Sequence, residues 1–257
     1  MRNVLAICKR EILSFFVSPI AYFVITGFVI LAGNFFFKGL AQFNYALARL
    51  AAMPYRGAMD APNLNQWVIE GYYHTLILIL VFLIPLLTMR LIADERKSGT
   101  FELLITSPLS VTEIVFGKFL GVAFVITTMC LLASIFPLLL CIWGNPEVLP
   151  VISGFFGLLL CSLAFASVGM AVSSFTEDQI IAGICSLVAL LMLYVIAIPG
   201  DKVGGSLKEV LNYISPVLQV QDLVSGVVSI KSCVYFASLI ALGLFLSQRA
   251  LEAYRWR

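Results

Sequence analysis

The sequence predicts an all-helical protein that crosses a membrane six times. Its composition and the lengths of its apolar stretches carry that prediction. Of its 257 residues, 61% are hydrophobic and only 12% are charged, with a mean hydropathy of +1.03. A soluble domain carries about 25% charged and about 45–50% apolar residues. The chain is therefore a polytopic membrane protein by composition, and its net charge of +2 is too small to indicate a nucleic-acid partner.

Six apolar stretches are long enough to be transmembrane helices, which need about 20 residues within a range of about 17–25. They lie at residues 20–37, 72–91, 119–143, 148–172, 179–199 and 227–246. Open strands are excluded because backbone groups in lipid must find partners within the spanning structure, and the alternating pattern of a barrel is missing from the sequence.

The basic residues favour an orientation with both termini on the cytoplasmic side. With the amino terminus inside, ten of the 16 Lys and Arg residues lie on the inner side and six on the outer side. An even number of spans also places both tails on one side. Residues 1–17 are predicted to form an interfacial helix, basic on one side and apolar on the other, which ends at the Ser18-Pro19 break.

A dense polar segment, residues 94–110, separates the second and third apolar stretches. It begins with Asp94-Glu95-Arg96-Lys97, and Ser98-Gly99 then supplies a break because glycine adopts conformations that other residues avoid. Thr100 has the character of an N-cap for a short helix over 101–106, which Ser107-Pro108 would end. Ser110 and Glu113 have the spacing of a capping box for the third membrane helix. Such a segment suits docking of a soluble partner, and an ordinary well-formed loop is the alternative.

Two regions on the other side of the membrane are predicted outside the spans. The loop over 38–71 has room for a short outer helix around 43–53, and Trp67, Tyr72 and Tyr73 have the character of an interfacial aromatic belt. The segment 200–226 is predicted to form two short helices, 207–214 and 217–224, separated by Ser215-Pro216. It is too polar to span, so it either dips into the interface against the protein or forms a surface loop.

Several kinds of active site are disfavoured by the residues available. The six cysteines form no CxxC pair and His74 is the only histidine, so neither a metal site nor a catalytic site is predicted. The central parts of the spans contain essentially no ionisable residues, which argues against an ion-coupled secondary transporter and against a membrane-embedded hydrolase. Gly117-Lys118 is followed by Phe119, and Thr112 stands where the first glycine of the motif G-x-x-x-x-G-K-[ST] should be, so no phosphate-binding loop is present there.

Two pairs of small residues have the spacing of close helix packing, within or between subunits: Gly117 with Gly121, and Gly169 with Ser173.

The polar segment carries a family resemblance. Residues 95–104, followed by Ser107-Pro108-Leu109-Ser110 and by Gly117-Lys118, resemble the E-R-x-S-G-T-x-E-x-L-L…P-x-S…G-K signature of the membrane subunits of type 2 ABC transporters. Segments 18–22 and 214–226 are similar to the same family. The tail, 252–257, resembles its gliding-motility-associated branch.

The resemblance implies a single permease domain over 1–257 that serves an ATP-driven exporter in a bacterial cytoplasmic (inner) membrane. Segment 94–110 would be the cytoplasmic coupling loop that docks on a nucleotide-binding ATPase subunit, and 200–226 would be a pair of outer re-entrant helices. ATP and magnesium would be bound by that ATPase and no cofactor by this chain. The other expected partners are a second permease copy or paralogue and an extracytoplasmic accessory protein. The alternative is an ATPase-coupled scaffold that moves or anchors extracytoplasmic machinery without transport.

The resemblance also implies roles for individual residues. The predicted coupling interface comprises Glu95, Arg96, Gly99, Thr100, Phe101, Glu102, Leu103, Leu104 and Pro108. Its apolar members would sit in a groove of the ATPase, its charged members would contact the rim, and Gly99 and Pro108 would set the angle of the helix. The residues expected to mark the outer segment are Pro216, Asp222 and Gly226.

Overall fold

The computed structural model describes residues 2–52, 63–97, 99, 109–144, 146–196 and 206–255, and within these ranges the chain is helical without any strand. The elements are α1 (Arg2–Val17), α2 (Pro19–Ala51), a π-helix η1 (Asn65–Glu70), α3 (Gly71–Thr88), α4 (Ala93–Lys97), α6 (Val111–Trp143), α7 (Val148–Phe175), α8 (Gln179–Val195), α9 (Ser206–Ile214), α10 (Pro216–Val224) and α11 (Ile230–Arg255).

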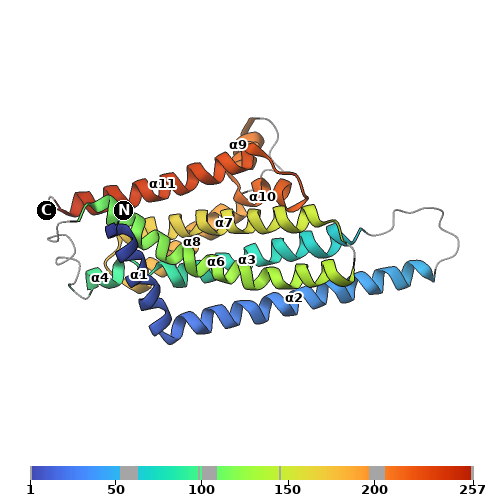
Figure 1. Ribbon diagram of the computed structural model, residues 1–257. Helices are drawn as coiled ribbons and strands as arrows, with labels where there is room; N and C mark the ends of the chain where they lie inside the picture. Colours follow the sequence, from blue (N-terminus) through green and yellow to red (C-terminus); the bar gives the residue numbers. More distant parts are fainter. Residues whose placement is uncertain are drawn as a thin grey trace.

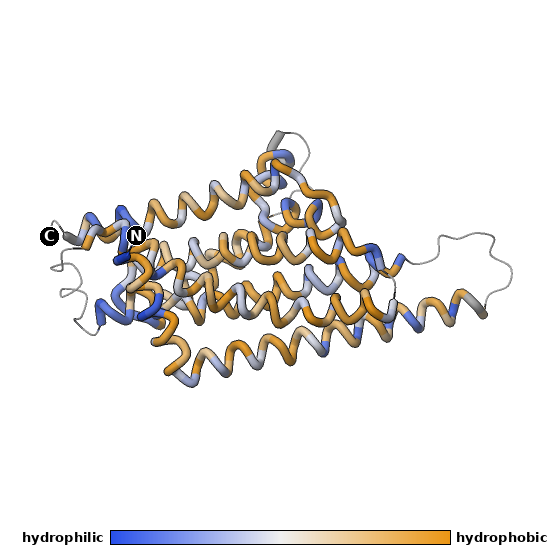
Figure 2. The backbone as a smooth tube through the Cα atoms, in the orientation of Figure 1, coloured by the Kyte–Doolittle hydropathy of each residue, from blue (hydrophilic) through white to orange (hydrophobic). Residues whose placement is uncertain are grey.

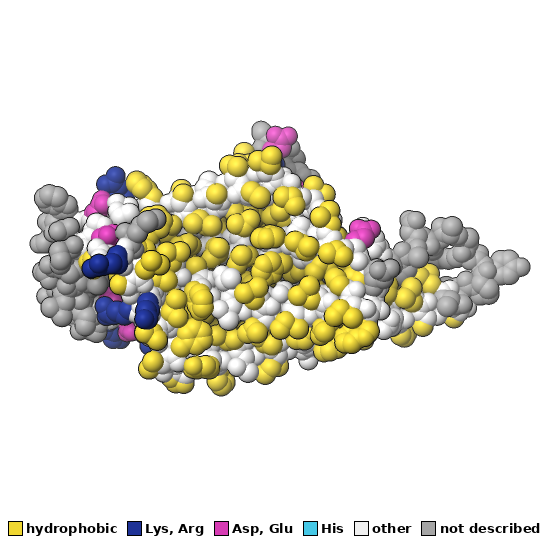
Figure 3. All heavy atoms as spheres, in the orientation of Figure 1, with side chains coloured by type: hydrophobic (Ala, Val, Ile, Leu, Met, Phe, Trp, Pro, Cys, Tyr) yellow, Lys and Arg dark blue, Asp and Glu magenta, His cyan; other side chains and the backbone are white. Residues whose placement is uncertain are grey.

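The long helices form a bundle around α7, which packs against α3, α6, α8, α10 and α11 (Figure 1). Both chain termini lie at one end of this bundle, and polar residues gather there and near the opposite end, while the surface between them is largely apolar (Figures 2 and 3). Among the described residues, five helices are long and apolar enough to span a membrane, and α8 is a shorter apolar helix of 17 residues. The predicted all-helical, multi-pass membrane fold is therefore confirmed.

The first spanning helix is longer than predicted. α2 has 33 residues, which corresponds to about 50 Å at about 1.5 Å per residue, against a hydrocarbon core of about 30 Å. The prediction of a separate outer helix around 43–53 is wrong, because residues 38–51 continue α2 without interruption. This stretch has no proline, and the single Gly39 is tolerated inside a helix. In Figure 1 the end of α2 projects past the other helices, at the end opposite the termini.

The predicted break at Ser18-Pro19 and the predicted capping box of the third membrane helix are confirmed. Ser18 is the N-cap of α2 with Pro19 in its first turn, so the chain turns sharply between α1 and α2. At the start of α6 the capping box is complete: Glu113 N donates to Ser110 Oγ at 3.2 Å, and Ser110 N donates to Glu113 Oε2 at 3.1 Å. These side chains satisfy backbone donors that a helix leaves without partners at its amino end.

The aromatic belt is corrected in part. Trp67 is exposed, but Tyr72 and Tyr73 are buried, and their hydroxyls donate to the carbonyls of Ala133 and Val151, both at 2.8 Å. The helix begins upstream with η1, so these two tyrosines lie inside it rather than at its entrance. A phenol can be buried in this way because its hydroxyl has found an acceptor.

Small residues allow the helices to approach closely within the chain. A β-carbon on Gly117 would lie 2.7 Å from Ile7, and one on Gly121 would lie 2.6 Å from Glu11, so both glycines admit α1 against α6. Gly169 faces Thr88, and Ser173 Oγ donates to the carbonyl of Met89 at 3.2 Å. The predicted packing pairs are therefore used between helices of one subunit.

The segment before the last spanning helix forms two short helices, as predicted. α9 and α10 are separated at Ser215, and Pro216 occupies the first turn of α10. α10 ends in a Schellman arrangement, because Val227 N donates to Asp222 O and Gly226 N to Leu223 O, with Gly226 at φ +98°. A residue with a side chain is strained at such a φ, so the glycine fixes where α10 ends.

Candidate functional site

The site is built on α4, the base of the polar segment. α3 ends at Thr88, and a buried turn through Leu91 and Ile92 leads directly into α4. Ser173 of α7 holds this turn, because its hydroxyl accepts from Ala93 N at 3.3 Å. α4 therefore starts from a fixed position, and its three successive charged residues, Glu95, Arg96 and Lys97, point to different neighbours.

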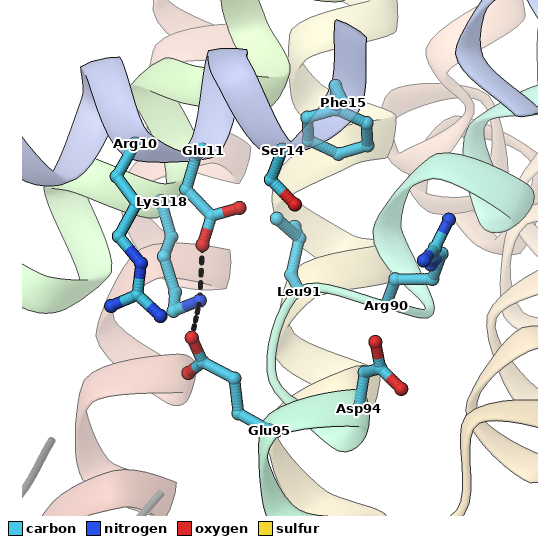
Figure 4. A pocket seen from close by; sticks show the side chains of 9 residues that line it. All are labelled: Arg10, Glu11, Ser14, Phe15, Arg90, Leu91, Asp94, Glu95 and Lys118. Carbon is cyan, nitrogen blue, oxygen red and sulfur yellow. Dashed lines mark hydrogen bonds and ion pairs between the residues drawn. The ribbon is translucent and has the colours of Figure 1, made fainter. Parts of the chain in front are cut away.

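Glu95 contacts a buried lysine. Lys118 Nζ lies 2.9 Å from Glu95 Oε1 and 2.5 Å from Glu11 Oε1, and only 3% of the Lys118 side chain is exposed (Figure 4). The three residues come from α4, α6 and α1, so one ammonium joins three helices that are remote in sequence. An isolated buried charge is costly, and here two carboxylates compensate it.

Arg96 lies over the ring of Tyr254, with 4.6 Å between the guanidinium carbon and the ring centroid. Tyr254 belongs to the last turns of α11, so this cation–π contact joins the base of the polar segment to the carboxyl-terminal helix. Glu177, in the turn between α7 and α8, lines the same pocket as both residues.

Lys97 pairs with Asp178, the N-cap of α8, at 3.5 Å between Nζ and Oδ2. A hydrogen bond from Ile180 N, at 2.8 Å, lowers the pKa of the Asp178 carboxyl, and Lys97 lowers it further. Both side chains of the pair are exposed, so it contributes little stability. Three consecutive residues of α4 thus contact three other elements. Glu95 contacts α6, and through Lys118 it is linked to α1; Arg96 contacts α11, and Lys97 contacts the start of α8.

Gly99 follows α4 with φ +71°. A β-carbon would meet no atom within 4 Å, so it is the backbone conformation that favours glycine here and not a lack of space. The predicted break at Gly99 is confirmed.

The rest of the predicted coupling interface lies outside the described residues, namely Thr100, Phe101, Glu102, Leu103, Leu104 and Pro108. Their roles remain predictions. Glu95 and Arg96 are described, and both are engaged with other helices of this chain. Their side chains hold α4 in place, and their predicted contact with the rim of a partner stays a prediction.

Sequence reasoning did not identify Lys118 and Glu11 as members of the site. Lys118 belongs to the Gly117-Lys118 pair of the family signature and Glu11 lies in the predicted interfacial helix, but no pattern in the sequence indicates that the two meet. One signal was present: Gly117 and Gly121 flank Lys118, and these small residues are where α1 packs on α6.

The residues expected to mark the outer segment lie at the opposite end of the bundle (Figure 1). Pro216 is buried, Asp222 is exposed, and Gly226 packs beside Pro150. α10 packs on α7, where a β-carbon on Gly157 would lie 2.9 Å from Leu223. In the part of the chain that the structure describes, no three His, Cys, Asp or Glu side chains are arranged to hold a metal ion.

Comparison with known families adds one finding. The family described as ABC-2 family transporter protein matches residues 5–247, which include α4 and extend from α1 into α11. No curated protein sequence gives a significant match to the chain.

Proposed function

Because the chain belongs to the ABC-2 family of transporter proteins and is a membrane permease component, we propose that it couples ATP hydrolysis by a separate nucleotide-binding subunit to export. The observation that carries the proposal is the set of contacts made by α4. A push on the polar segment 94–110 would reach α1 and α6 through Glu95, α11 through Arg96 and α8 through Lys97.

The mechanical argument depends on burial. The Lys118 contacts are shielded from water, so they resist separation better than exposed pairs do. α4 is also continuous with α3 through a buried turn, and α3 packs on α7 and α8. A displacement of the loop base therefore has rigid routes into the bundle. In this proposal Phe101, Leu103 and Leu104 make the contact with the ATPase, and Glu102 contacts its rim.

The orientation and assembly belong to the same proposal. The charged end with both termini would face the cytoplasm of a bacterial cell with this chain in its inner membrane, as the distribution of basic residues favours. α9 and α10 would then lie at the outer mouth of the pathway. A second permease copy or a paralogue would complete that pathway, and the ATPase subunits would hold ATP and magnesium.

Co-expression of the chain with the proteins encoded by its genomic neighbours, followed by a search for a co-purifying ATP-binding protein, tests the proposal. We expect the two to co-purify and the permease to stimulate ATPase activity. Gly99→Ala and Gly71→Ala form a matched pair, because a β-carbon meets no atom within 4 Å at either site, whereas only Gly99 has positive φ. Gly99→Ala should lower the stimulation and Gly71→Ala should leave it unchanged. Equal activity in the two variants would contradict the role assigned to Gly99, and a permease that purifies without an ATPase would contradict the coupling itself.

A scaffold role is the second candidate. The projecting end of α2 supports it, because Tyr45, Leu47 and Leu50 are exposed on a helix that extends beyond the other helices. Reconstituted vesicles distinguish the two roles. A scaffold would hydrolyse ATP with its partner without moving any candidate substrate. In a scaffold, deletion of residues 45–51 would also release the extracytoplasmic machinery.

A further inference from the structure

A polar pocket of about 210 Å³ lies at the charged end, between α1, the turn after α3, α4 and α6 (Figure 4). Six of its lining residues carry charge. Three of these, Glu11, Glu95 and Lys118, are joined to one another. The remaining three are Arg10, Arg90 and Asp94, so the pocket holds two cations and one carboxylate beyond the ion-paired group.

Arg90 and Asp94 are both half-buried, yet within the described ranges neither has a partner of opposite charge within 4 Å. Among the described residues, the Arg90 side chain makes a single hydrogen bond, from Nη1 to Ser18 Oγ, at 3.2 Å. A guanidinium has five N–H donors, and unpaired charges that are partly removed from water are costly. The pocket therefore presents donors and an acceptor suited to a charged ligand.

The depth of the pocket indicates where that ligand comes from. Arg90 follows the end of α3 by two residues, and Ser18 is the N-cap of α2. Both positions mark the point where a membrane-length apolar helix begins or ends, so the pocket lies at the level of lipid headgroups. Lipid phosphates and amines are concentrated at this level.

We propose that this pocket binds the headgroup of a phospholipid that carries a primary amine, of the phosphoethanolamine type. Its phosphate would accept hydrogen bonds from Arg90, and its ammonium would donate to Asp94. Arg10 lies on the other side of the Glu11–Lys118–Glu95 group and is assigned no contact (Figure 4). A purely anionic headgroup fits less well, because it would leave Asp94 unpaired and would face the excess carboxylate of the Glu11–Lys118–Glu95 group. A choline headgroup has no N–H to donate.

Native mass spectrometry of the purified chain, titrated with defined lipids, tests the proposal without depending on transport or on an ATPase. We expect phosphatidylethanolamine to bind about fivefold or more tightly than phosphatidylcholine, since one charge-assisted hydrogen bond distinguishes them. Asp94→Asn should remove that preference, and Arg90→Gln should weaken binding of both lipids. Arg249→Gln is the matched control, because Arg249 lies on α11 paired with Glu252, away from the pocket.

Three results would overturn the assignment. Phosphatidylglycerol binding as tightly as phosphatidylethanolamine would show that the amine is not recognised. A preference that survives Asp94→Asn would remove the ammonium site. Soluble phosphoethanolamine that binds when the lipid does not would make the ligand a free phosphate ester. Size-exclusion profiles would establish that the variants fold, and if Arg90→Gln fails this check, the lipid preference of Asp94→Asn still tests the same pocket.

Discussion

The two ends of the bundle are held together by different chemistry. At the end with the termini, contacts between distant segments are ionic or involve a cation: Lys118 with Glu11 and Glu95, Arg96 with Tyr254, and Lys97 with Asp178. At the opposite end, tyrosine hydroxyls donate to backbone carbonyls, as Tyr72 does to Ala133 and Tyr73 to Val151. Tyr235 donates to Ile214 in the same way, at 2.5 Å.

This difference indicates that the two ends of the bundle have different roles. The charged contacts lie around α4, at the base of the polar segment 94–110. There they connect helices that are remote from one another in sequence. At the opposite end neutral hydrogen bonds hold α9 and the start of α3, and the cation–π contact of Lys231 over the Tyr213 ring, at 5.4 Å, is an exception. Hydrogen bonds of this kind avoid placing a charge near lipid, where it would be costly. We therefore expect substitutions at the charged end to affect coupling and stability together, and those at the opposite end to affect stability alone.

The largest effect is expected for Lys118→Met. Removing the buried cation leaves Glu11 and Glu95 facing each other without compensation, which should cost about 3–5 kcal/mol. Thermal unfolding in detergent measures the loss, and Lys97→Met is the matched control because its pair is exposed. A loss no larger than that of Lys97→Met would show that the Lys118 contacts do not stabilise the charged end.

At the neutral end, Tyr73→Phe should have a smaller effect. It removes one hydroxyl that donates to Val151 O, and a hydrogen bond of this kind contributes about 0.5–1.5 kcal/mol. Unfolding in detergent should show this loss while ATPase stimulation stays at the wild-type level. A change in stimulation without a change in stability would contradict the division between the two ends.

Tyr254→Leu should cost about 0.5–1 kcal/mol, since it removes the aromatic face that Arg96 contacts and keeps an apolar side chain. Coupling should fall more than stability, because α11 loses its link to α4. Tyr254→Trp retains a ring for the guanidinium and should restore stimulation. Failure of the tryptophan variant to do so, with normal folding, would argue against the cation–π contact.

The smallest effect is expected at Asp178. Its pKa is lowered in the folded state by the hydrogen bond from Ile180 N, so its contribution is present above its ordinary pKa of 3.8 and is lost as the pH falls through the lowered value. Asp178→Asn keeps a cap and should remove this acid dependence. Hydrogen exchange in the first turn of α8 between neutral and acid pH measures it. Identical pH profiles in the two proteins would contradict this assignment.

The sequence was sufficient to predict the elements because apolar length, Ser18-Pro19 and the Ser110–Glu113 box act locally. It failed where helices meet. Nothing local indicates that Lys118 reaches Glu11, 107 positions away, or that Tyr72 and Tyr73 turn inward. The continuation of α2 was missed for a related reason, because a polar helix beyond the membrane has the composition of a loop.

The most direct test of the account is a photo-cross-link from position 101. A benzoylphenylalanine replacing Phe101, in the chain co-expressed with its ATPase, should cross-link to the subunit that an azido-ATP analogue also labels. The same replacement at Tyr45, which is exposed at the projecting end of α2, should not. Cross-linking of the ATP-binding subunit from 101 alone is the predicted result. No cross-link from 101, or an equal one from 45, would contradict the assignment of segment 94–110 as the coupling element.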